Sequence, residues 1–65
     1  MEPHQQRVID EHDALNDKIG KLGQFFMSPL YRSLPKEEQS RLDRQHKIMR
    51  LYSDVLVERI AAFPK

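Results

Sequence analysis

Arg59 is the side chain with the clearest chemical requirement in this 65-residue sequence. It lies in a predicted helix over residues 41–63, whose main apolar line repeats every seven residues at Leu42, Met49, Leu56 and Phe63. Polar side chains recur at the same interval in the alternate positions of that face, at Gln45, Tyr52 and Arg59. A guanidinium there must meet an anion or a carbonyl oxygen, because an unpaired buried charge is costly. The sequence therefore predicts a structural ion pair with Asp10 or Glu11, or a contact with a phosphate group.

Other cationic side chains could take part in the same anion binding. If the chain folds back on itself, His4 and Arg7 reach the end that carries Arg59, and Lys18 and Lys21 lie beside two glycines that leave room for a ligand. A further series, Arg41, Arg44, Lys47 and Arg50, recurs every three residues. That spacing drifts around a helix, which is typical of a solvated charged face, and contact with nucleotide phosphates is the alternative.

Catalysis and metal binding find no support in the sequence. The three histidines, His4, His12 and His46, do not share the four-residue spacing of a helical metal pair. His12 is interpreted as a hydrogen-bonded core histidine. No nucleophile motif, phosphate-cradling glycine loop or cofactor fingerprint occurs. We therefore expect neither an enzyme nor a bound metal or cofactor.

Two long helices must position these side chains. From Pro3 to about Phe26, apolar residues follow the same seam pattern, at Val8, Leu15 and Leu22 interleaved with His12, Ile19 and Phe26. Between the helices, Ser28-Pro29 predicts a short helical turn over residues 30–33, and Leu34-Pro35 precedes the long second helix. The expected fold is all-α: an antiparallel two-helix hairpin that forms one domain over residues 1–65.

Self-association is expected, because the hairpin has more apolar surface than one partner helix can cover. A core of this size rarely supplies more than about 3–5 kcal/mol, and no cysteine is present to add a disulfide. A second apolar line runs beside the first in the long helix. The predicted interface combines this line with residues around the connection, and comprises Phe25, Phe26, Leu30, Tyr31, Ile48, Leu51 and Val55.

Composition limits the possible partners. With 11 basic and 10 acidic residues, the chain has no strong positive field, so long nucleic acid is not expected as a ligand. No run of about 18 apolar residues could span a membrane, and the polar N-terminus does not look like a signal peptide. A cytoplasmic protein is expected.

A family resemblance is carried by three blocks of the sequence, which are QQRVIDEHDALNDKIGKLGQFF, then SLPKEEQSRL with RQHKIM, then YSDVLVERIAAF. Together they cover nearly the whole chain. They resemble very small phage proteins with an opening Q-R-V, then L-x-x-K-I-x-K-L, a loop ending in L-P-x-x-E-Q, and a closing Q-x-x-x-M-x-x-Y-S-x-x-L-x-x-R-I. These are similar to the helical-hairpin domain of phage anti-CBASS and anti-Thoeris sponge proteins, which sequester cyclic oligonucleotide or cyclic ADP-ribose signals.

The resemblance implies a hexamer that binds cyclic di- or trinucleotides between its subunits and does not degrade them. The aromatic residue that stacks on a base in the family falls at His4, and Tyr52 is a second candidate for stacking. The phosphate-binding lysine corresponds to Lys18 or Lys21, and the late arginine to Arg59. Two alternatives remain open: a helical adaptor or inhibitor that binds another protein, and a nucleic-acid accessory protein that uses residues 41–50.

Overall fold

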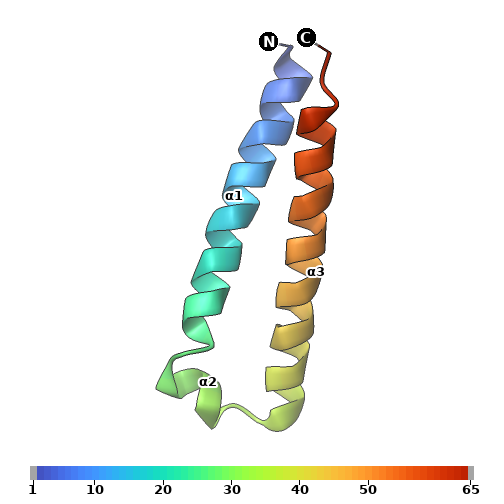
Figure 1. Cartoon of the computed structure of the whole chain (residues 1–65). Helices are drawn as coiled ribbons and strands as arrows, with labels where there is room; N and C mark the ends of the chain where they lie inside the picture. Colours follow the sequence, from blue (N-terminus) through green and yellow to red (C-terminus); the bar gives the residue numbers. More distant parts are fainter. Residues whose placement is uncertain (1, 65) are drawn as a thin grey trace.

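The computed structural model describes residues 2–64 and shows three helices in the order α1 (Pro3–Phe25), α2 (Pro29–Ser33) and α3 (Lys36–Ala61). The two long helices run antiparallel side by side, α2 crosses the closed end, and both termini lie at the open end (Figure 1). The expected all-helical hairpin with a short helical turn in its connection is therefore confirmed.

Capping interactions set the helix boundaries. Pro3 occupies the first turn of α1, where its missing N–H costs nothing, and the backbone N–H of Glu2 donates to Gln5 Oε1 at 3.0 Å. Ser28 caps α2, because its hydroxyl accepts from the Tyr31 N–H at 3.3 Å. Before α3, Gln39 Nε2 donates to the Leu34 carbonyl at 2.9 Å and fixes the chain entering that helix.

The core is a thin line between α1 and α3. Its buried hydrophobic residues are Val8, Leu15 and Leu56, and its partly buried ones are Ile19, Met49, Ile60 and Phe63. The molecule measures 48 × 15 × 13 Å, and its radius of gyration of 15.0 Å exceeds the value of about 11 Å expected for a compact chain of this length. The hairpin is a rod, and most of each helix faces outward.

One expectation about α3 is wrong. The predicted apolar line is correct, but the residues that alternate with it toward α1 are His46, Ser53 and Ile60, one position after the expected Gln45, Tyr52 and Arg59, which are exposed. Contacts from α1 explain this choice. Ser53 Oγ donates to Asn16 Oδ1 at 2.9 Å, and the His46 ring packs edge-on against Phe26 with centroids 5.2 Å apart. Arg59 is thus not buried in the seam.

An aromatic cluster closes the loop end. The Tyr31 ring meets Phe26 and Phe25 edge-on, with centroid distances of 5.0 and 6.0 Å, and its hydroxyl donates to the Gln39 carbonyl at 3.4 Å. Three of the residues expected at an oligomer interface therefore contact one another within the chain, whereas Leu30 is 68% exposed. Within residues 2–64, neither long helix is apolar enough over its length to cross a membrane.

Candidate functional site

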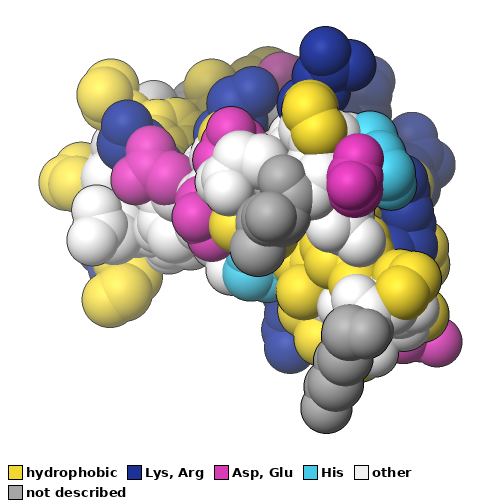
Figure 2. Space-filling view, turned by 90° about the horizontal axis from the view of Figure 1, so that it is seen from above, with side chains coloured by type: hydrophobic (Ala, Val, Ile, Leu, Met, Phe, Trp, Pro, Cys, Tyr) yellow, Lys and Arg dark blue, Asp and Glu magenta, His cyan; other side chains and the backbone are white. Residues whose placement is uncertain are grey.

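The outward face of α3 carries an uncovered apolar line. Ile48, Leu51 and Val55 are 58%, 65% and 50% exposed, so the second apolar line predicted from the sequence does lie at the surface. Arg44 precedes this line and Arg59 follows it, and both are exposed. Seen from the open end of the hairpin, basic side chains gather along the upper and right-hand edges of the view, with hydrophobic and acidic ones among them (Figure 2).

The hydrogen bond between Asn16 and Ser53 identifies one long edge of the hairpin. Each residue turns a helix by about 100°, so Tyr52 points away from that edge, on the other side of the buried seam of α3. On α1, Lys18 falls about 60° to one side of buried Leu15, and Asn16 falls about 100° to the other. Tyr52 and Lys18 therefore share the edge opposite the hydrogen bond.

The same helical geometry places the other expected ligand-binding residues. We call the shared edge the cationic edge, defined by His4, Arg7, Lys18, Tyr52 and Arg59. All five are exposed, and Arg7, Lys18 and Arg59 form no ion pair with any residue between 2 and 64. The structure thus brings five of the six expected residues to one side of the hairpin, where the exposed carboxylate of Glu11 also lies, without an ion pair to them among residues 2–64.

Lys21 is the exception. It lies further around α1, and its Nζ is 3.0 Å from Asp17 Oδ2. This is an i, i+4 acid–base pair on one helix, and Lys47 and Asp43 form another, also at 3.0 Å. Neither pair is buried, so both are solvated helix pairs rather than parts of a pocket.

His12 is hydrogen-bonded, as expected from the sequence, but it is partly exposed and does not belong to the core. Its Nε2 accepts from Asn16 Nδ2 at 3.1 Å, and its Nδ1 lies 3.3 Å from Asp13 Oδ1, so both ring nitrogens have partners. Asn16 in turn accepts from Ser53 across the hairpin. This chain of polar contacts links side chains of α1 to α3.

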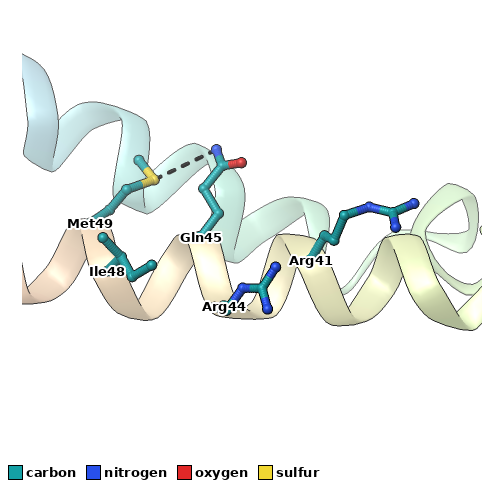
Figure 3. A pocket seen from close by; sticks show the side chains of 5 residues that line it. All are labelled: Arg41, Arg44, Gln45, Ile48 and Met49. Atoms are coloured by element: carbon teal, nitrogen blue, oxygen red, sulfur yellow. Dashed lines mark hydrogen bonds between the residues drawn. The ribbon is translucent and has the colours of Figure 1, made fainter.

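A groove on α3 opens on the same side as the cationic edge, nearer the loop. It has a volume of about 350 Å³ and is lined by Arg41, Arg44, Gln45, Ile48 and Met49 (Figure 3). The Arg41 Nε donates to Glu38 Oε1 at 2.8 Å. The groove is open to solvent along its length, whereas small-molecule sites normally bury 70–90% of a ligand. One chain alone does not enclose a nucleotide.

A family model, Sequestin, matches residues 2–62. The chain belongs to the Sequestin family. This agrees with the resemblance to phage sponge proteins found in the three sequence blocks. No curated protein and no solved structure matches the chain.

The family name suggests a sequestering role. Such a protein has to hold its ligand by contact energy alone, and the described surface offers the necessary elements: free cations, an aromatic ring and exposed apolar side chains. Among residues 2–64, no three His, Cys, Asp or Glu side chains cluster as they would around a metal ion. The described surface of this Sequestin family member thus combines exposed cations with the exposed ring of Tyr52.

Sequence reasoning missed the groove, although its signal was present. Arg41, Arg44 and Ile48 are spaced by three and four residues, which is the spacing of one helical face. The series Arg41, Arg44, Lys47 and Arg50 was treated as a single set. The structure divides that set between two hollows. Arg41 and Arg44 line the groove, whereas a second hollow of about 260 Å³ is lined by Lys47, Arg50, Leu51 and Asp54.

Proposed function

We propose that this protein is a phage sponge that sequesters cyclic di- or trinucleotides without degrading them. It assembles as a homo-oligomer, a hexamer by family resemblance, and works in the cytoplasm of an infected bacterium. Each ligand lies between subunits, with phosphates on Arg59, Lys18 and Arg7 and a base stacked on Tyr52 or His4.

The observation that carries the proposal is the cationic edge. Three cations without an intramolecular partner among residues 2–64 line the same edge as Tyr52, whose side chain is available for stacking because the residue is 43% exposed. A cyclic oligonucleotide presents several phosphate groups held close together, next to flat bases. Guanidinium groups match phosphate oxygens, and aromatic rings stack on any base, so the two kinds of group on this edge match both parts of the ligand.

Exposed area supports binding sites built by several subunits. The chain exposes 5241 Å², whereas a compact monomer of 7.8 kDa exposes about 4400 Å². The excess is of the order of 800 Å², which is what one partner contributes to a standard protein interface. Association of copies would cover this surface and would enclose ligands that the open hairpin leaves in solvent.

Titration with cyclic nucleotides tests the proposal. Calorimetry and thermal denaturation with a panel of cyclic di- and trinucleotides should give binding of at least one member and a concentration-dependent rise in Tm, since a ligand of the native state stabilises it by mass action. A linear dinucleotide with the same bases serves as the control for simple charge attraction. The proposal fails if no cyclic nucleotide binds, or if the linear control binds equally tightly.

The exposed line of Ile48, Leu51 and Val55 favours a second candidate, a helical adaptor that binds a different protein. Native mass measurement separates the two. A chain that remains monomeric at micromolar concentration and ignores every cyclic nucleotide has its apolar line free for another protein. A stable homo-oligomer that takes up ligand in defined stoichiometry has that line covered by its own copies.

A further inference from the structure

The outward face of α3 has a regular pattern that neither the fold nor the proposed ligand site explains. Five residues follow one another at steps of four, three, four and three, namely Arg44, Ile48, Leu51, Val55 and Glu58. We call them the outer stripe. These steps are those of a coiled-coil seam, yet all five residues are exposed. The outer stripe is therefore a helix-packing surface without a helix on it.

Charge decides what kind of helix fits this surface. A cation, Arg44, begins the outer stripe, an anion, Glu58, ends it, and Leu51 lies midway between them. Neither end forms an ion pair among residues 2–64. A parallel second copy would place Arg44 against Arg44 and Glu58 against Glu58, and such like-charge contacts are costly. An antiparallel copy centred on Leu51 places each arginine opposite a glutamate.

We propose that a second copy of the chain packs antiparallel on the outer stripe, and that the pair shares anion sites made by Arg59 of one copy and the partner's Arg41. The two-fold axis passes beside Leu51. Ile48 of each copy then lies between the partner's Leu51 and the partner's Val55, as a knob packs into a hole. Arg44 pairs with the partner's Glu58 at both ends of the interface.

Helix geometry gives the shared anion sites. Arg41 and Arg59 are separated by about five full turns, so they project from the same edge of α3. A two-fold axis perpendicular to both helices keeps that edge on the same side in the two copies. With Leu51 at the centre, Arg59 of one copy faces a point on the partner's α3. That point lies about 3 Å along the helix axis from the partner's Arg41. Two guanidinium groups so placed attract an anion between them, in addition to the Glu38 carboxylate that already accepts from Arg41 Nε.

The inference deepens the proposed function, because residues of the partner copy would enclose a ligand on the cationic edge. The groove beside Arg41 and the cationic edge at Arg59 lie at opposite ends of α3 in one chain (Figures 1 and 3). In the antiparallel pair each groove meets the partner's Arg59. The part that concerns the ligand rests on the proposed function, whereas the antiparallel pairing does not.

Cross-linking tests the pairing without any ligand. The natural chain has no cysteine, so Leu51→Cys and Ser40→Cys each introduce one thiol on the outward face of α3. With a short bifunctional thiol reagent, Leu51→Cys should give a covalent dimer and Ser40→Cys should not, because antiparallel packing separates the two Ser40 positions widely. Equal cross-linking of both variants would mean parallel packing, and no cross-linking of either would mean a different interface. Either result overturns the inference.

Charge exchange tests the same pairing by an independent route. Arg44→Glu or Glu58→Arg alone should lower the association constant at least tenfold, since each single change creates a like-charge contact at both ends. The double variant with both changes should recover the association of the natural chain. If the single variants associate normally, or if the double variant is no better than either, Arg44 does not meet the partner's Glu58.

Subunit mixing tests the shared anion site. Arg41→Ala and Arg59→Ala should each lower cyclic-nucleotide affinity at least tenfold, while Arg32→Ala on α2 serves as a control that keeps it. A mixed pair of the two binding variants regenerates one intact site, so mixing them should restore part of the high-affinity binding. No recovery, with exchange of subunits confirmed by native mass, would place Arg41 and Arg59 outside a common site. Absence of any cyclic-nucleotide binding to the natural chain would instead count against the proposed function and leave the cross-linking result standing.

Discussion

The two faces of α3 are alike in sequence and opposite in environment. The inward face steps by three and four residues through Met49, Ser53 and Leu56, and Leu56 is 0% exposed. The outward face steps in the same way through Ile48, Leu51 and Val55, which are at least half exposed. The inward face is covered by α1, and the outward face by nothing within the hairpin. Folding therefore depends on the inward face, and the outward face is left available for association.

Leu56→Ala is expected to give the largest effect on this comparison. Removing a fully buried leucine side chain costs about 2–5 kcal/mol, which is comparable to the whole stability of a domain of this size. The variant should lose most of its helical circular dichroism at ambient temperature. Val55→Ala, one residue away on the outward face, is the matched control and should keep its helix content. Equal loss of helix in the two variants would remove the distinction between the faces.

Val55→Asp should act on association while the hairpin remains folded. A carboxylate on the outward line would be buried between two copies, which is costly, whereas in a single chain it stays in water. Sedimentation and native mass should show smaller particles than the natural chain forms. Val57→Asp, at a site 49% exposed but turned away from the outer stripe, is the control and should keep the natural mass. A Val55→Asp variant of unchanged mass would exclude this face as an interface.

Most of the fold could be predicted from the sequence, because its signals are local and agree with one another. Heptad spacing marked both helices, and Ser28, Pro29 and Pro35 marked the connection between them. The seam of α1 was correct as well, since its alternate positions, such as Ile19 and Phe26, are apolar. Where both pattern and residue type point inward, sequence alone is sufficient.

The alternate positions on α3 could not be predicted in the same way. Gln45, Tyr52 and Arg59 compete with His46, Ser53 and Ile60, and either series continues a seven-residue repeat. The structure selects the second series through the partner helix: an added methyl on Gly23 would come within 3.7 Å of His46 Nε2, and Asn16 accepts from Ser53. Such pairing between distant residues leaves no local signal. Arg59 was therefore expected at a seam position and is found at the surface.

The candidate site was predictable as a set of residues but not as an arrangement. Residue type and family resemblance selected Arg59 and Lys18, whereas their position on one edge depends on the packing of the helices. Arg59 was expected to need an anion because it would be buried. Its exposure removes that reason, and in the proposed pair an anion is favoured beside Arg59 because the partner's Arg41 would lie there. The ligand and interface roles of these residues stay predictions.

Arg59→Ala tests the cationic edge, which lies between the inward and outward faces of α3. Loss of a charge-assisted hydrogen bond to phosphate should weaken cyclic-nucleotide binding by more than about 1.5 kcal/mol, while native mass stays unchanged. Arg50→Ala, on the edge opposite the cationic edge, is the control and should bind as the natural chain does. Dissociation of the oligomer by Arg59→Ala would instead make this arginine part of the interface.

Ser53→Ala should give the smallest effect, and it tests the inward face only. The variant removes the hydrogen bond from Ser53 Oγ to Asn16 Oδ1, a contact worth about 0.5–1.5 kcal/mol because the exposed Asn16 can turn to water instead. Urea denaturation should show this loss, and Ser40→Ala, at an exposed position, should not show it. A double-mutant cycle with Asn16→Ala isolates the contact, since the two changes share one bond. Additive effects would mean that the helix register is held by the apolar seam alone, with no contribution from the polar network of His12, Asn16 and Ser53.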